Sequence, residues 1–409
     1  MPNSPTPARW ATRAEALEPF LAMEVLERAA ELEREGIDIA HLELGEPEFA
    51  PPAAATRAAT EALARDDTGY TDSRGLWPLR EAIAGDLERR FGQSVTPERV
   101  LVTQGTSSAM TLVFSCLVEA GDEVLIPTPH YPCYPNFVRF CGAKPIFVPT
   151  EAENGWHIDP ERVRRAITPK TKAIIIGSPA NPTGAVQPRE VMEALAQMGP
   201  TLIADEIYDG LVYDGVETTS AITLGENHFV LDGFSKRYAM TGFRLGWVVA
   251  PESAMRRLQI LQQNLFISAS SFVQHAGIAA IEEGAQMTAD LVAACGERRT
   301  LLVDGLRRLG FGIDREPEGA FYVLADARAF GDDSRALAFE LLERAHVGIT
   351  PGIDFGEAAE GRLRFCYALS PDTIETALTR LEPVLAELSS GANGNLKIGD
   401  RNRGKEGLA

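Results

Sequence analysis

The sequence predicts an α/β fold in which a mostly parallel sheet lies between layers of helices, with a smaller α+β domain beside it. From Pro51 to about Glu283, helical stretches alternate with short β-branched runs, the pattern of strands joined by crossover helices. The runs are nearly all apolar, as expected for strands buried on both faces. The expected strands are Val100–Thr103, Glu123–Ile126, Lys172–Ile176, Leu202–Ala204, Phe229–Asp232 and Gly246–Val249.

Ahead of this alternation, an amphipathic helix is expected from Ala14 to Gly36. Apolar residues recur there among Glu and Arg at helical spacing, and Gly36 ends the run. The next run, Ile37 to Leu44, is typical of a short strand that leads into a turn at residues 45–47.

After the alternation, a helical stretch from Thr288 to Leu309 precedes two apolar runs, Gly319–Val323 and Arg364–Tyr367, which we interpret as strands of the smaller domain. Ser389–Ala409 is rich in Gly, Asn, Lys and Arg, so a disordered tail is expected. The predicted divisions are an N-terminal segment (1–50) that packs with the small domain and lines the interdomain cleft, a large domain (51–287), a small C-terminal domain (288–388) and the tail (389–409).

Composition excludes several classes of protein. The 409 residues include 39 Lys and Arg against 58 Asp and Glu, a formal charge of −19. This acidic balance argues against binding to nucleic acid or to anionic membranes. The longest apolar runs, such as Ala109–Val118, fall short of the roughly 20 residues that cross a bilayer, and the N-terminus does not resemble a secretory signal. The expected location is therefore the cytoplasm.

The cysteines and histidines indicate no metal site. Five cysteines form no CxxC pair, which fits neither a disulfide framework nor a thiolate site, so reduced and mostly buried thiols are expected. The six histidines are scattered without ligand spacing. The chain also lacks the GxGxxG, GxxxxGK[ST], HExxH and GxSxG motifs, which removes the main support for dinucleotide, P-loop, zincin and α/β-hydrolase functions.

Polar residues instead follow several of the predicted strands, where doubly wound sheets bind their ligands. Lys236 follows one strand and precedes Arg244, Asp205 ends another, and Asn181 begins an Asn-Pro-Thr-Gly turn after a third. The stretch Thr103–Ser108 joins a strand to a helix and leaves backbone N–H groups and hydroxyls free for an anion. Taken singly, each has an ordinary explanation as a loop charge, a helix cap or a turn residue.

Together and in this order, these residues resemble the class I/II aminotransferase family, the aspartate aminotransferase-like enzymes of pyridoxal phosphate fold type I. The resemblance extends from about Arg13 to Leu388 and rests on Asn-Pro-Thr-Gly at 181–184, Asp-Glu-Ile-Tyr at 205–208, and Ser-Lys with Gly-Phe-Arg between 235 and 244. It implies pyridoxal 5′-phosphate as cofactor and ping-pong transfer of an amino group from an α-amino acid to a 2-oxo acid.

The resemblance also implies catalytic roles. Lys236 would form a Schiff base with the cofactor aldehyde and then act as general base and acid at the substrate Cα. Asp205 would pair with the pyridine nitrogen and keep it protonated. Asn181 and the catalytic Tyr208 would donate to the cofactor's 3′ oxygen.

Other residues would hold the cofactor. Tyr131 matches an aromatic residue stacked on the cofactor ring. Tyr70 matches a tyrosine that reaches the phosphate from the neighbouring subunit, which implies a homodimer with shared active sites. The phosphate would be bound by Gly105, Thr106, Ser107, Ser235 and Arg244.

The substrate carboxylate would be bound by Arg364, Gly45 and Asn181, with Arg362 as the competing assignment for the arginine. The N-terminal segment could then close over the cleft as a lid. The side-chain pocket is expected around Phe20–Met23, Tyr131–Tyr134 and Phe355. No second cation matches a distal carboxylate, which favours a neutral or broad substrate range, with glutamate or alanine as donor and 2-oxoglutarate or pyruvate as acceptor.

Two alternatives remain open at this point. A pyridoxal phosphate-dependent lyase, either β-eliminating or resembling aminocyclopropane-carboxylate synthase, would share the lysine and aspartate. A non-catalytic ligand-sensing module is the other, although Lys236, Asp205 and Arg364 favour catalysis.

Overall fold

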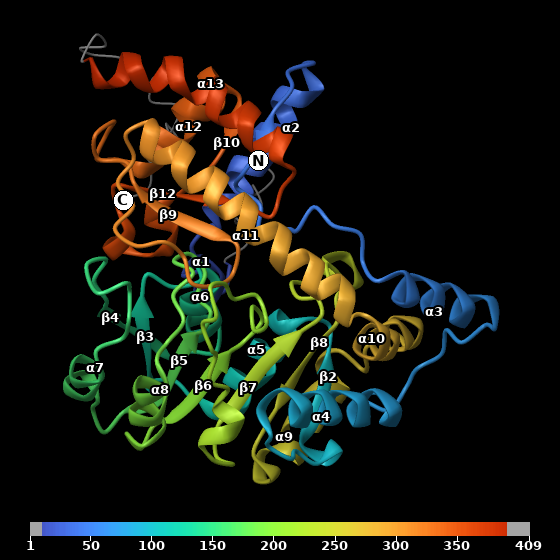
Figure 1. Ribbon diagram of the computed structural model, residues 1–409. Helices are drawn as coiled ribbons and strands as arrows, with labels where there is room; N and C mark the ends of the chain where they lie inside the picture. Colours follow the sequence, from blue (N-terminus) through green and yellow to red (C-terminus); the bar gives the residue numbers. More distant parts are fainter. Residues whose placement is uncertain (1–9, 391–409) are drawn as a thin grey trace, which may run out of the picture.

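A seven-stranded sheet forms the centre of the larger part of the molecule (Figure 1). The computed structural model describes residues 10–390. The strand order is β2-β8-β7-β6-β5-β3-β4, and only β8 runs antiparallel to its neighbours. The strands are β2 (Val100–Thr103), β3 (Glu123–Thr128), β4 (Lys144–Pro149), β5 (Thr171–Gly177), β6 (Thr201–Asp205), β7 (Phe229–Gly233) and β8 (Gly246–Val249). The predicted mostly parallel sheet is thereby confirmed.

All the predicted strands of this sheet are present, but β4 was missed. Most of its side chains are exposed or half-exposed, and Phe147 is 44% exposed; β4 is the edge strand opposite β2. With these partly exposed side chains, β4 lacks the buried apolar run by which the other strands were recognised, including the opposite edge strand β2.

Helices cover both faces of this sheet, and each face has its own hydrophobic core. Alternation along β6 shows the division, because Leu202 and Ala204 pack in one cluster and Ile203 in the other. The first cluster includes residues of α3 (Ala53–Ala64), α4 (Trp77–Phe91), α7 (Pro160–Ala166), α8 (Arg189–Ala196) and α10 (Ser271–Glu283); the second includes residues of α5 (Thr106–Leu117), α6 (Cys133–Phe140) and α9 (Glu252–Leu265).

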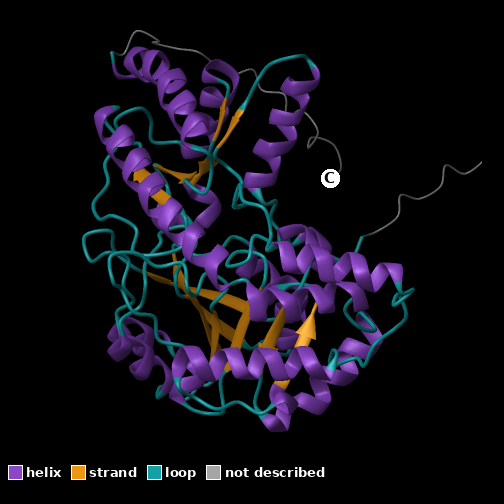
Figure 2. Cartoon of the chain, turned by 45° about the vertical axis from the view of Figure 1, so that its right-hand side comes forward, coloured by secondary structure: helices purple, strands orange, loops and turns teal. Residues whose placement is uncertain are grey.

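The smaller part lies above the large sheet and has its own group of strands (Figure 2). An antiparallel sheet has the order β11-β12-β9, and β1 pairs in parallel with β10. The long helix α11 reaches from the large part into the small one (Figure 1). The elements are α2 (Leu21–Arg34), β1 (Ala40–His41), α11 (Ala285–Arg308), β9 (Tyr322–Asp326), α12 (Ser334–Ala345), β10 (Val347–Gly348), β11 (Thr350–Pro351), β12 (Arg362–Cys366) and α13 (Pro371–Ser389), with 3-10 turns at Pro97–Arg99, Ala221–Leu224, Thr241–Phe243, Gly352–Phe355 and Glu357–Ala359.

The prediction for the N-terminal helix was wrong at its start. A short helix, α1 (Thr12–Glu15), is followed by a break, and α2 begins only at Leu21. Pro19 explains the break, since proline disfavours a helical residue before it and donates no N–H. The expected strand from Ile37 to Leu44 is reduced to β1. Of the expected tail, Ser389 ends α13, and residues 391–409 lie outside the described residues.

Membrane spans and cysteines can be stated for residues 10–390. None of the helices there is long and apolar enough to cross a membrane. All five cysteines are free thiols, but only Cys295 and Cys366 are buried, so the expectation that most are buried was too broad.

Candidate active site

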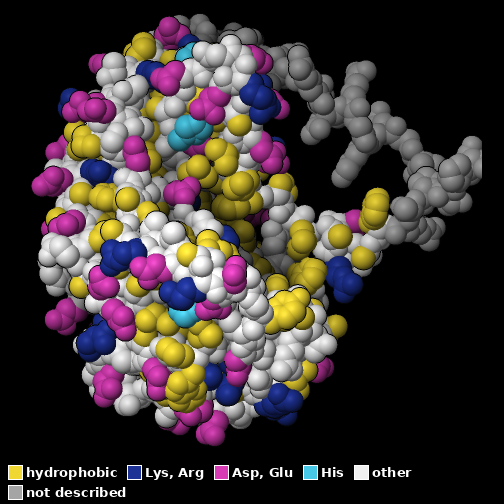
Figure 3. Space-filling model, turned by 90° about the vertical axis from the view of Figure 1, so that its right-hand side faces the viewer, with side chains coloured by type: hydrophobic (Ala, Val, Ile, Leu, Met, Phe, Trp, Pro, Cys, Tyr) yellow, Lys and Arg dark blue, Asp and Glu magenta, His cyan; other side chains and the backbone are white. Residues whose placement is uncertain are grey.

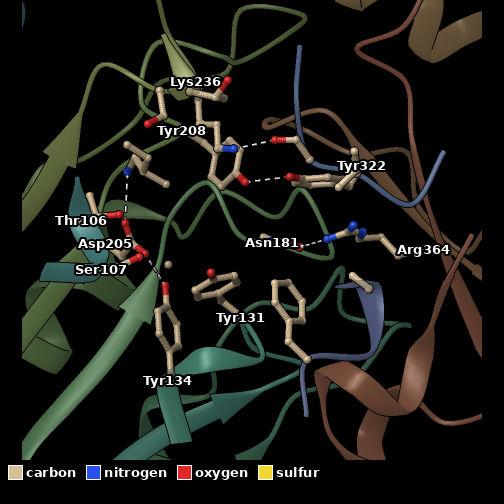
Figure 4. Close-up of a pocket in the computed structure, with 18 of the residues that line it drawn as sticks. Thr106, Ser107, Tyr131, Tyr134, Asn181, Asp205, Tyr208, Lys236, Tyr322 and Arg364 are labelled. Atoms are coloured by element: carbon tan, nitrogen blue, oxygen red, sulfur yellow. Dashed lines mark hydrogen bonds between the residues drawn. The ribbon is translucent and has the colours of Figure 1, made fainter. Parts of the chain in front are cut away.

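A cleft opens where the carboxyl ends of β5, β6 and β7 face the smaller sheet (Figure 4). This is the edge at which α/β sheets of this type bind ligands. The cleft has a volume of about 210 Å³, and most of the residues singled out from the sequence line it: Gly45, Thr106, Ser107, Tyr131, Asn181, Asp205, Tyr208, Ser235, Lys236, Arg244 and Arg364.

Three of the expected residues are placed differently. Gly105 lies directly before the lining residue Thr106, as the N-cap of α5. Tyr70 does not line the cleft of its own chain, and its side chain is 89% exposed. Phe355, expected in the pocket wall, is fully buried and packs 5.1 Å from the Arg364 guanidinium, so that expectation was wrong.

Lys236 is a half-buried amine at the top of the cleft (Figure 4). It follows β7, and its Nζ donates to the carbonyl oxygen of Gly45. Burial lowers the pKa of Lys236 to about 8, because an ammonium ion loses solvation there. About a tenth of the amine is therefore neutral and nucleophilic at pH 7, far more than for a lysine with the usual pKa.

Asp205 is a buried carboxylate at the end of β6. It is 5% exposed, and it accepts hydrogen bonds from Tyr134 Oη at 2.7 Å and from the backbone N–H of Ile207 at 3.3 Å. Burial raises the pKa of Asp205 to about 6. No Lys, Arg or His among residues 10–390 forms an ion pair with it, so the carboxylate can accept from a cationic N–H group of a ligand.

The turn before α5 is shaped for an anion. Gly105 has φ 83° and ψ 172°, a conformation essentially restricted to glycine, and a Cβ there would lie 2.9 Å from Arg244 Nη2. Thr106 and Ser107 form the first turn of α5, so hydroxyls, backbone N–H groups and the Arg244 guanidinium lie together at a helix N-terminus.

Arg364 is held on β12 with its guanidinium in the cleft. It is 2% exposed, and it donates to Asn181 Oδ1 at 3.1 Å, to Thr350 Oγ1 at 2.9 Å and to the carbonyl oxygen of Glu43. The competing Arg362 instead forms an ion pair with Asp314. The structure therefore brings Arg364, and not Arg362, to the cleft.

Two tyrosines in the site were missed as partners of the predicted residues. Tyr134 binds Asp205, and Tyr322 forms a 2.8 Å hydrogen bond with Tyr208 (Figure 4). Tyr322 also lies 4.4 Å from the Arg364 guanidinium, and a Cβ on Gly45 would come within 1.9 Å of its hydroxyl. A tyrosine within the apolar run of a predicted strand gives no sign in the sequence that its hydroxyl reaches a cleft.

Comparison with known proteins agrees with this site. Residues 37–381 match the family model of class I and II aminotransferases. An aspartate/prephenate aminotransferase of Thermus thermophilus is 39% identical over 380 residues, which is 91% of this chain and 98% of that protein. A valine–pyruvate aminotransferase of Mycobacterium tuberculosis is 38% identical over 370 residues, 89% of this chain and 95% of that protein.

A solved structure shows the same fold. The aspartate aminotransferase of Thermus thermophilus with maleate superposes with a TM-score of 0.87 at 38% identity, covering 92% of this chain and all of that chain. The fold, the cleft and these matches together show that the chain is a transaminase that belongs to the class I and II aminotransferases, a pyridoxal phosphate-dependent family.

Proposed function

We propose that this cleft binds pyridoxal 5′-phosphate and that Lys236 is the residue joined to it. The observation that carries the proposal is the pairing, within one cleft, of an amine whose pKa is lowered to about 8 with a buried carboxylate that lacks a cationic partner among the described residues. Perturbed groups that converge in a cleft are typical of functional sites.

The donors present fit the parts of this cofactor. Gly105, Thr106, Ser107, Ser235 and Arg244 suit a phosphate, and the glycine-only backbone at Gly105 leaves room for the Arg244 guanidinium. Asp205 suits the pyridine nitrogen, because a buried carboxylate favours the protonated ring. Asn181 and Tyr208 suit the 3′ oxygen, and the Tyr131 ring suits stacking.

The bound cofactor supplies an aldehyde that joins reversibly to amines and a ring that withdraws electrons from the substrate Cα. The side chains supply binding and proton transfer. Lys236 Nζ would take the proton from the Cα of the donor amino acid in one half of the reaction and would return a proton to the Cα of the product amino acid in the other. Arg364 binds the substrate carboxylate with its planar fork, aided by Asn181 and the Gly45 backbone N–H. The substrates are an α-amino acid and a 2-oxo acid.

The N-terminal segment is proposed to close the cleft as a lid. Two hydrogen bonds join Glu18 to Asn136 of α6. The backbone N–H of Glu18 donates to Asn136 Oδ1 at 3.1 Å, and Asn136 Nδ2 donates to the carbonyl oxygen of Glu18 at 2.9 Å. The same segment is held to the smaller part, since Asp354 accepts from the backbone N–H groups of Leu21 and Ala22 at 3.0 and 3.2 Å. Residues 18–22 thus bridge the two parts beside the cleft, which supports a closing role.

A homodimer with shared active sites is also proposed. Several large hydrophobic side chains are exposed, and the face of the molecule that lies at the right in Figure 1 carries hydrophobic side chains around a hollow (Figure 3). Tyr70 and Ile267 belong to this set, at 89% and 47% exposure. Hydrogen bonds join their loops to each other and to Gln104, because Ser268 Oγ accepts from the Thr71 N–H and the Ser268 carbonyl oxygen accepts from Gln104 Nε2. Exposed apolar surface of this kind favours a protein interface, and Tyr70 would then reach the phosphate of the partner's site. A cytoplasmic location remains a prediction of the sequence.

Borohydride tests the central proposal, because it makes a reversible carbon–nitrogen bond to the cofactor permanent. After reduction and digestion, mass spectrometry should find the cofactor on the peptide that contains Lys236, and the Lys236→Ala variant should carry no label. Amino acids added singly to the unreduced protein should convert the absorption spectrum of the bound cofactor to that of its aminated form, without release of ammonia. Label on another lysine, or ammonia release without an acceptor, would contradict the proposal.

A further inference from the structure

Among residues 10–390, no Lys or Arg is left free in the part of the cleft that would receive the substrate side chain. The only Lys and Arg residues that line the cleft among the described residues are Lys236, Arg244 and Arg364. In the proposed function, which this inference rests on, Lys236 and Arg244 bind the cofactor. Arg364 already donates from both terminal nitrogens and would take the carboxylate common to all α-amino acids. None of the three is left to pair with a second carboxylate.

Two acidic side chains lie near this part, and one of them, Glu43, is among the residues that line the cleft. Glu43 is fully buried, and its Oε1 lies 2.7 Å from His41 Nδ1. Asp354 uses one oxygen for the N–H of Leu21 and the other for that of Ala22. A substrate carboxylate would therefore enter a region with two acids nearby, the buried Glu43 and the half-buried Asp354.

Apolar side chains cover the remaining wall. The wall consists of Phe20, Ala22, Met23, Leu44 and Tyr131, which we name the side-chain wall. The rings of Phe20 and Tyr131 meet edge to face, with centroids 6.0 Å apart at 87°. Met23 is 42% exposed, and its flexible thioether can adapt to ligands of different shape.

With the N-terminal segment closed over the cleft, as described here, contacts also hold the wall in place. Asp354 binds the start of α2, which bears Ala22 and Met23, and the hydrogen bonds between Glu18 and Asn136 hold the chain just before Phe20. Figure 4 shows the Tyr131 ring turned into the cleft. A wall that is already ordered loses little conformational entropy when an apolar group packs on it.

From these contacts we infer that the enzyme selects amino acids with large, uncharged, apolar or aromatic side chains over dicarboxylic ones. Each methylene buried on the wall favours binding, whereas a distal carboxylate would lose its solvation without gaining a partner.

Unreactive carboxylates test this selectivity by calorimetry on the cofactor-loaded protein. We expect 3-phenylpropionate to bind at least about tenfold more tightly than succinate or propionate. Equal or tighter binding of succinate would overturn the inference. A partner subunit that supplied a cation to the cleft would produce this result as well. These compounds can bind without amino transfer, so the two proposals fail in different ways. Absence of label on Lys236 would contradict the proposed function, whereas equal or tighter binding of succinate would contradict this inference.

A matched pair of variants locates the selectivity on the wall. Met23→Lys adds one positive charge at an exposed position of α2 that lines the cleft, and we expect it to lower the preference for 3-phenylpropionate over succinate by roughly tenfold. Glu27→Gln adds the same net charge one turn later, at an exposed residue that does not line the cleft, and the preference should stay as in the wild type. An unchanged preference in Met23→Lys, or equal shifts in both variants, would refute the assignment of Met23 to the wall.

Discussion

Replacing Tyr134 by Phe should destabilise the cofactor-free protein by an amount that grows with pH. Tyr134 is 4% exposed, and its hydroxyl donates to Asp205 at 2.7 Å, so the variant removes one hydrogen bond and little volume. A hydrogen bond to a charged group contributes roughly 1.5–3 kcal/mol, against about 0.5–1.5 kcal/mol for a neutral pair. The variant should therefore lose about 1–2 kcal/mol more of its free energy of unfolding when Asp205 is ionised than when it is protonated.

The pH range follows from the pKa of Asp205, which is raised to about 6 in the folded protein. Loss of the hydroxyl should raise that pKa further. The rise is roughly one pKa unit for each 1.36 kcal/mol by which the hydroxyl stabilises the ionised form of Asp205 more than the protonated form. In the folded variant, Asp205 therefore stays protonated up to a higher pH than in the folded wild type, whereas in the unfolded chains it is already ionised. The free energy of unfolding of the variant consequently falls relative to that of the wild type as pH rises from about 6 to about 8.

Urea unfolding of both proteins at pH 5 and pH 8.5, at equal protein concentration, measures this difference. The Asp205→Asn background is the control, since the pH dependence of the Tyr134→Phe effect should vanish there. A destabilisation that is the same at both pH values in the wild-type background would refute the link between this hydroxyl and the ionisation of Asp205.

Three further predictions concern the cofactor and substrate contacts. Arg364→Lys should raise the KM for the amino acid roughly 10- to 100-fold in steady-state assays, because a lysine cannot form the two parallel bonds of a guanidinium, whereas Arg362→Lys should leave KM unchanged. Gly105→Ala should cost about 1–3 kcal/mol of stability in urea unfolding and weaken cofactor binding, since φ 83° with ψ 172° is strained for alanine; normal stability and affinity would contradict the described turn. Tyr70→Phe should raise the dissociation constant of the cofactor roughly tenfold in fluorescence titrations, and mixing it with Lys236→Ala should restore one complete site per mixed dimer; no restoration would argue against a shared site.

Much of the architecture was predictable because it depends on local patterns. The buried strands β2, β3, β5, β6, β7 and β8 are short apolar runs between helical stretches, and these runs are visible in the sequence. The misplaced features depend on other effects. Pro19 breaks the N-terminal helix although the helical spacing of apolar residues continues past it. The strand β4 was not recognised because most of its side chains are exposed or half-exposed, so that it lacks a buried apolar run.

The site divides in the same way. By itself, the sequence determined that Lys236, Asp205 and Asn181 lie at or just after the ends of strands, with Arg244 shortly after Lys236, and parallel strands bring such strand-end residues to one edge of a sheet. Only the tertiary structure decided that Arg364 rather than Arg362 reaches the cleft, and that Tyr134 and Tyr322 bind Asp205 and Tyr208. Those contacts join residues 71 or more positions apart, and Tyr322 and Arg364 come from the second sheet. Spacing along the chain cannot reveal them, because the packing of the two sheets against each other sets these distances.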